Sequence, residues 1–189
     1  MTSSVTELQP ELLRGTWVID TKHSTLAFSA RHAMVATVRG RFSEFSGSIT
    51  IDPDDPSKAT AEVDIVAASL DSRTPDRDGH LKSPDFLDVE RFPKLAFRSS
   101  RSAAGDEPGS YKLWGDLTIR DVTREVELDI EFQGVATDPF GQLRAGFEGQ
   151  AAINRKDWGL VWNVALEKGG VLVGEKVKLS LDVSAIKQG

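Results

Sequence analysis

Three histidines are the side chains of this sequence whose charge normally changes near neutral pH. His80 follows Asp76 by one helical turn, a spacing that suits a general base or two ligands of a metal ion. His23 lies in a turn where backbone bonding is expected, and His32 falls in phase with inward positions of a strand. The sequence contains no standard catalytic signature, no third ligand in phase and no cysteine. We therefore expect no catalytic site and no metal or other cofactor, and a structural role for His80.

The stretch that carries His80, residues 74–93, contains two helix-start patterns. Thr74 and Ser83 are each followed by proline and aspartate. This order supplies an N-cap hydroxyl, a proline at the first helical position and an acid at the positive end of the helix dipole. Phe92-Pro93 ends the second pattern. We expect two short helices here, whose apolar side chains close one end of a β-barrel.

Almost all the remaining chain alternates apolar and polar residues with period two, which is typical of strands with one buried face. The alternation changes parity near Ser43-Glu44, where we expect a β-bulge. The pattern predicts a short strand at 16–20 and long strands at 25–34, 37–52, 60–70, 94–101, 111–120, 122–135, 143–153 and 174–184.

About eight long strands with one apolar face indicate an all-β antiparallel barrel, because closure removes unpaired edges. Many glycines and alanines on the apolar face favour an interior with empty volume that holds one apolar ligand. The alternative is a β-sandwich with a solid core. We expect a polar leader segment at 1–14 and a single barrel domain at 15–189.

Composition narrows the choice of partners. The net charge of −6 argues against nucleic acid, which requires clustered cations. No apolar stretch is long enough to span a membrane as a helix, and residues 1–10 lack a signal-peptide pattern. We therefore expect a cytoplasmic protein without a transmembrane segment.

Aromatic residues gather on the inward positions and beside the predicted barrel end. Phe86 belongs to the helical insert, and Trp158 and Trp162 lie on a loop that follows a strand. Trp114 is out of inward phase, so we expect it on the surface, where it could contact a partner.

Several spaced motifs, covering about residues 15–184, resemble the YceI-like family. These are Asp20-x-x-His23-Ser24-x-x-x-Phe28-x-x-x-His32, Gly40-x-Phe42-x-x-Phe45-x-Gly47, Arg77-Asp78-x-His80-Leu81-x-Ser83-x-Asp85-Phe86-x-Asp88, Gly115-x-Leu117-Thr118-Ile119 and Asn154-Arg155-x-Asp157-x-Gly159. The resemblance implies an extended, lipocalin-like barrel of eight antiparallel strands that binds a long isoprenoid chain, such as a polyprenyl lipid or an isoprenoid quinone. It also implies a homodimer, since many relatives are dimeric, and many relatives are exported to the periplasm.

Our hypothesis is therefore a carrier or sequestering protein for an apolar isoprenoid-type lipid. His32 is the expected polar contact in the cavity, and the insert and the tryptophan loop are the expected entrances. The residues expected to bind the lipid are Phe28, His32, Phe42, Phe45, Phe86, Phe97, Leu117, Ile119, Phe132, Phe147, Trp158 and Trp162. One alternative is an enzyme acting on a small apolar substrate through a cavity histidine, either His32 or His80. Another is a barrel used only for protein contacts, without an internal void.

Overall fold

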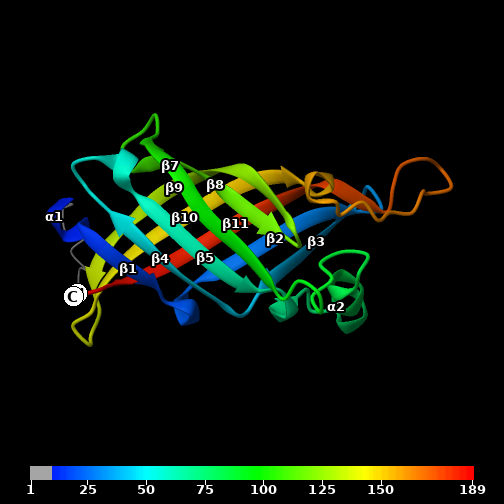
Figure 1. Cartoon of the computed structure of the whole chain (residues 1–189), viewed down its shortest axis with the longest axis horizontal. Helices are drawn as coiled ribbons and strands as arrows, with labels where there is room; N and C mark the ends of the chain where they lie inside the picture. The colour runs from blue at the N-terminus through cyan, green and yellow to red at the C-terminus, as the bar shows by residue number, and fades with distance from the viewer. Residues whose placement is uncertain (1–9) are drawn as a thin grey trace.

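The computed structural model describes residues 10–189 as one antiparallel sheet that closes into a barrel (Figure 1). The closed ring runs β1-β4-β5-β7-β8-β9-β10-β11, and β1 returns to pair with β11. The strands are β1 (Gly15–Ile19), β2 (Thr25–His32), β3 (Ala36–Phe42), β4 (Phe45–Ile51), β5 (Thr60–Val66), β6 (Leu70–Asp71), β7 (Lys94–Ala104), β8 (Ser110–Ile119), β9 (Val122–Thr137), β10 (Leu143–Asn154) and β11 (Val173–Lys187). The helices are α1 (Pro10–Leu13), α2 (Pro75–Lys82) and the 3₁₀ turns η1 (Thr21–His23), η2 (Pro56–Lys58), η3 (Ala67–Ser69) and η4 (Arg155–Trp158).

Three of these strands lengthen the barrel beyond the closed ring. β2 continues β1 after η1, and both pair with β11. β3 leads into β4, and the break at Ser43-Glu44 lies where the change of parity predicted it. β6 continues β5 and pairs with β3. Joined in this way, the eleven strands form eight long antiparallel stretches around the barrel. This confirms the extended barrel and excludes the sandwich.

The barrel wall has a gap between β6 and β7. β6 pairs with β3, whereas β7 pairs with β5 and β8. The segment between them carries α2, which lies beside this end of the barrel (Figure 1). Asp78 accepts a hydrogen bond from the Ser72 N–H at 2.8 Å, and Arg77 donates to the Ser72 carbonyl at 2.7 Å. These bonds anchor α2 to the end of β6.

The expectation of a second helix after Ser83 is wrong. Ser83 ends α2, and its hydroxyl donates to the His80 carbonyl at 2.6 Å. Residues 83–92 then form turns, in which the N–H groups of Phe86 and Asp88 both bond to the Ser83 carbonyl. Asp88 has φ +49°, a left-handed conformation that interrupts a helix. The Thr74 hydroxyl makes no cap bond either, and it accepts a bond from Arg77 instead.

The opposite end of the barrel is covered by α1. The indole N–H of Trp17 donates to the Leu13 carbonyl at 2.9 Å, and Lys187 donates to the Leu12 carbonyl at 2.8 Å. Arg14 forms ion pairs with Asp52 and Asp54 across the mouth of the β4–β5 turn. The rest of the predicted leader, residues 1–9, lies outside the described residues.

Within residues 10–189, no helix has both the length and the hydropathy needed to cross a membrane.

Candidate functional site

The larger cavity of the barrel lies next to the α2 insert and has a volume of about 240 Å³. Its wall combines inward side chains of β2, β3, β5, β7, β8, β9 and β11 with three side chains of the insert, Leu81, Phe86 and Leu87. Apart from Arg155, every lining residue is apolar. A cavity of about 150 Å³ with apolar walls is known to stay dry and to take up an apolar molecule. This cavity therefore has the size and the lining to receive a hydrocarbon chain.

A second cavity of about 170 Å³ occupies the other half of the barrel, near the β4–β5 turn and the β7–β8 hairpin. Its polar lining residues include Ser102, Tyr111 and Lys112, while its inner part is apolar. The two cavities share six wall residues at mid-barrel: Ile19, Val63, Phe97, Leu128, Leu181 and Val183. Because they meet at the same side chains, the two cavities together follow much of the barrel axis.

Glycines on the inner face give aromatic rings a place against the wall. A Cβ atom at Gly40 would lie 2.4 Å from Cζ of Phe28, and one at Gly115 would lie 2.4 Å from Cζ of Phe97. Both rings thus occupy the space that a side chain at the glycine would fill. The expected empty volume in the interior is present, but at Gly40 and Gly115 the neighbouring rings fill the space beside the glycine and the lumen lies beyond them.

An aromatic cluster joins the insert to the loop that precedes β11. The Trp162 ring contacts His80 edge-on, with centroids 4.4 Å apart, and lies 5.6 Å from the Phe86 ring. His80 also contacts Phe86 at 5.1 Å. Because Phe86 lines the larger cavity, this cluster lies directly behind the cavity wall. The insert and the tryptophan loop therefore close the same end together.

Asp76 is not the partner of His80. The His80 Nε2 atom lies 2.9 Å from a carboxylate oxygen of Asp85, in the turn that follows α2. The turn brings Asp85 back towards the helix, a contact that helical spacing does not predict. The bond ties the turn region to α2 and orients the imidazole towards the Trp162 ring.

Arg155 is the one charged residue in the lining of the larger cavity, and it is almost fully buried. Its guanidinium donates to four backbone carbonyls, those of Leu160, Trp162, Val173 and Gly174, at 2.6–3.1 Å. Burial lowers the pKa of Arg155 from its ordinary value, and the charge of Glu175 opposes this shift. Arg155 thus holds together both ends of the loop that carries Trp162.

The structure brings together about half of the predicted binding residues. Phe28, Phe42, Phe86, Phe97, Leu117 and Ile119 line the larger cavity, and Phe97 and Phe147 line the smaller one. Phe45 lies instead in the buried core around Trp17, and Phe132 packs against Phe147 with ring centroids 5.5 Å apart.

The expected positions of His32 and Trp158 are wrong. His32 is exposed at the end of β2 and lines neither cavity. The last residue of β2 that lines the larger cavity is Ala30, and the alternation of the strand continues beyond it. Trp158 is buried in the core, where its indole N–H donates to the Leu117 carbonyl at 2.9 Å. The turn η4 folds this ring inward, and Gly159 with φ +79° redirects the chain.

Sequence reasoning missed Arg155 as a lining residue, although it stands in one of the quoted motifs. An arginine after an apolar strand normally indicates solvent, and only its four carbonyl partners explain its burial. Several aliphatic lining residues were also missed, because the expectation concentrated on aromatic residues. Their inward parity was the available signal for Ile65, Leu95, Leu128, Leu179 and Leu181.

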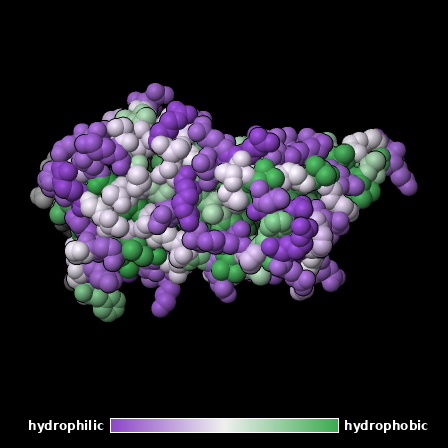
Figure 2. All heavy atoms as spheres, in the orientation of Figure 1, coloured by the Kyte–Doolittle hydropathy of each residue, from purple (hydrophilic) through white to green (hydrophobic). Residues whose placement is uncertain are grey.

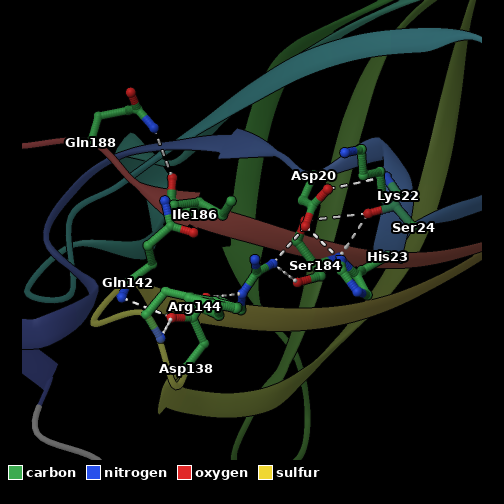
Figure 3. Close-up of polar contacts among 11 residues, drawn as sticks. Asp20, Lys22, His23, Ser24, Asp138, Gln142, Arg144, Ser184, Ile186 and Gln188 are labelled. Atoms are coloured by element: carbon green, nitrogen blue, oxygen red, sulfur yellow. Dashed lines mark hydrogen bonds and ion pairs between the residues drawn. The ribbon is translucent and has the colours of Figure 1, made fainter.

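A charge network lies away from both cavities, at the kink between β1 and β2 (Figure 3). Asp20 accepts bonds from Arg144 at 2.6 Å, from His23 at 2.7 Å and from the Lys22 N–H at 3.0 Å. The bonds from Arg144 and His23 lower the pKa of Asp20 to about 2. Arg144 also donates to Asp138 in the β9–β10 turn at 2.8 Å. This network joins the β1–β2 kink to β10 and explains the Asp20 and His23 motif structurally.

Neither cavity lining contains a histidine. Within residues 10–189, no three His, Cys, Asp or Glu side chains are grouped so as to hold a metal ion.

Trp114 is half-buried on the barrel wall, and Arg101 lies 4.0 Å above its ring, so its outward phase is as predicted.

A closed barrel of eight long antiparallel stretches around an apolar cavity defines a lipocalin-like protein. The model of the YceI-like domain matches residues 17–185, and the chain belongs to the YceI-like family. The UPF0312 protein SA2479 of Staphylococcus aureus is 36% identical over 86% of this chain and 92% of its own length.

Solved structures share this fold. BcnA of Burkholderia cenocepacia superposes with a TM-score of 0.75 at 20% identity, covering 88% of this chain and 98% of that one. The YceI protein of Campylobacter jejuni gives 0.70 at 26% identity, covering 84% and 90%. A polyisoprenoid-binding domain from Saccharophagus degradans, implicated in plant cell wall breakdown, gives 0.68 at 13% identity, covering 93% and 100%.

Proposed function

We propose that this protein binds and carries a long apolar lipid of the isoprenoid type, such as a polyprenyl chain or an isoprenoid quinone, inside the barrel. The observation that carries the proposal is the pair of abutting cavities with an almost wholly apolar inner wall. Family membership supports it, as does the fold shared with a polyisoprenoid-binding domain.

The driving force for binding would be hydrophobic. Each buried CH₂ group contributes about 0.8 kcal/mol, so a long chain needs few polar contacts. Methyl branches along the chain would pack against aromatic rings such as Phe28, Phe42 and Phe97. The wall of the larger cavity offers no polar partners that a hydrocarbon would leave without hydrogen bonds, apart from Arg155.

Arg155 suggests the orientation of the lipid. An arginine carries five N–H donors, and four hydrogen bonds to backbone carbonyls are present. The remaining donor on Nη2 favours an oxygen atom at this end of the cavity. We therefore place the oxygen-bearing end of the lipid near Arg155 and its tail towards the β4–β5 turn.

Extraction of the purified protein with organic solvent, followed by mass spectrometry, tests the proposal. We expect an isoprenoid-type lipid in stoichiometric amount. The stripped protein should also bind an added isoprenoid quinone, detected by quenching of tryptophan fluorescence, because Trp158 packs behind the cavity wall. If no lipid is extracted and no quinone binds, the proposal fails.

A homodimer remains a separate expectation, which light scattering after size-exclusion chromatography tests.

A further inference from the structure

Exposed apolar side chains concentrate at one end of the barrel. Seven large apolar side chains stand out as exposed in residues 10–189, and four of them lie on two loops at the same end. The exposed fractions are 80% for Val35, 60% for Val161, 56% for Met34 and 47% for Val164. We call these four residues the apolar tip. A group of exposed apolar side chains of this kind indicates contact with a partner.

The apolar tip is preformed, because hydrogen bonds tie its two loops together. The Ala33 N–H donates to the Leu172 carbonyl at 2.7 Å, and the Leu172 N–H donates to the Val164 carbonyl at 2.9 Å. Asn163 adds side-chain bonds to Val164 and Val173 within the longer loop. At the end of the molecule where the loop that precedes β11 projects beyond the barrel in Figure 1, Figure 2 shows green apolar spheres together with purple hydrophilic spheres, which lie outermost. The surface is thus part of a projection whose two loops are held in place.

Cations surround the apolar tip although the chain carries a net charge of −6. Arg31 and Lys168 adjoin the tip on its two loops, and Lys176 stands at the start of β11. All three are exposed, and no carboxylate of residues 10–189 lies within ion-pair distance of them. Two acids, Glu167 and Glu175, adjoin these cations in the sequence. Glu175 forms an ion pair with Lys156 at 2.6 Å.

A second row of cations lies behind the first. Lys178 of β11 and Arg39 of β3 flank Ser29 of β2 in register, on the outer face of the barrel. Both are exposed. This basic strip extends from the tip along β2, β3 and β11, so the local charge opposes the net charge of the chain.

We propose that the apolar tip inserts into the interface of a lipid bilayer that contains anionic lipids, and that the barrel docks there to exchange its ligand. Exposed aliphatic side chains on a projection, with cations beside and behind them, match the apolar core and the anionic headgroups of such a bilayer. The tip residue Val161 follows Leu160, which lines the larger cavity, and Val173 connects the loop to that same wall. The purpose of docking rests on the proposed lipid binding, whereas the docking surface itself does not depend on it.

Sedimentation with vesicles tests the proposal. The full chain is mixed with vesicles of phosphatidylcholine plus phosphatidylglycerol, or of phosphatidylcholine alone. We expect binding to the anionic vesicles, reduced by salt, and a loss of about tenfold in partition for the double variant Val35→Ser/Val161→Ser. The double variant Lys168→Glu/Lys176→Glu should reduce the partition onto anionic vesicles about tenfold and change the partition onto neutral vesicles little.

The matched control is Phe140→Ser. Phe140 is 89% exposed in the β9–β10 turn, at the opposite end of the barrel, so its loss should leave vesicle binding unchanged. Thermal unfolding of every variant shows that the fold is kept. Equal binding by the tip variant and the wild type overturns the proposal, and so does binding only to membranes that carry proteins, which would assign the tip to a protein receptor.

The extraction experiment separates this inference from the proposed function. Protein that contains lipid but ignores vesicles of both compositions disproves membrane docking and leaves lipid binding intact. Protein that docks on vesicles through the tip but never contains lipid disproves the carrier and leaves the docking surface.

Discussion

The Phe28 ring lies against Gly40, its cross-strand neighbour, where a side chain would otherwise stand. The two residues are paired in the β2–β3 register, and a Cβ atom built at Gly40 would lie 2.4–3.0 Å from three atoms of the ring. No other heavy atom comes nearer to that position than the ring does. The glycine therefore sets how far the Phe28 ring stands from the barrel axis.

We predict that Gly40→Ala reduces lipid binding by narrowing the larger cavity. The added methyl group must displace the Phe28 ring, and the free direction is the lumen that this ring already lines. Overpacking of this kind costs about 1–3 kcal/mol. Quinone titration followed by tryptophan fluorescence measures the loss, and the double variant Gly40→Ala/Phe28→Ala should recover binding.

Gly79→Ala is the matched control for this substitution. A Cβ atom at Gly79 meets nothing within 4 Å, and alanine favours the helix in which Gly79 lies. Lipid binding should be unchanged in this variant. If Gly40→Ala binds lipid as tightly as Gly79→Ala does, the glycine has no part in shaping the lumen.

We predict that Trp162→Ala speeds the exchange of bound lipid severalfold. The Trp162 ring supports both His80 and Phe86, and its removal frees the insert to move away from the cavity end. An aromatic pair of this kind contributes about 0.5–1.5 kcal/mol beyond its burial. Transfer of a fluorescent quinone to acceptor vesicles gives the rate. Trp114→Ala removes a ring from the outer wall and should leave the rate unchanged, and a common rate in both variants would contradict a role for this cluster.

We predict that Arg155→Met destabilises the fold by about 3–5 kcal/mol, because it leaves buried carbonyls without donors. The loss should concentrate in residues 159–174, where the four carbonyls lie. Urea unfolding gives the total, and hydrogen exchange shows whether this loop opens first. Arg155→Lys retains the charge but has fewer donors, so its free energy of unfolding should lie between those of the wild type and Arg155→Met. Uniform exchange along the chain would show that the residue has no local clamping role.

We predict that Asp20→Asn lowers the stability at pH 7 by about 2 kcal/mol and that the difference disappears in acid. The pKa of Asp20 in the folded state is about 2, below its ordinary value of 3.8, through hydrogen bonds from Arg144 and then from His23. A carboxyl group whose pKa is lowered in the folded state stabilises the fold at pH values above its ordinary pKa. This contribution is lost as the pH falls towards 2. Urea unfolding of both proteins between pH 7 and pH 2 tests the convergence. A difference that stays constant over this range would rule out the charge of Asp20 as its cause.

Predictions from the sequence succeeded where they rested on the alternation of residues along a strand, and failed for the second helix start at Ser83. Alternation along each strand identifies the inward face of Phe28, Phe97 and Leu117, because successive side chains of a strand point to opposite faces. The break at Ser43-Glu44 was visible for the same reason. The pattern failed at His32, since parity states which face a residue is on but not where the cavity ends.

The sequence by itself determined an all-β chain with one apolar face, an insert near its midpoint and the family to which it belongs. The tertiary structure alone decided the closure of β1 on β11, the partner of His80, the inward turn of Trp158 and the burial of Arg155. Each of these depends on where a turn or a loop returns after leaving its strand. Such returns are fixed by packing and hydrogen bonds between segments, which no local periodicity records.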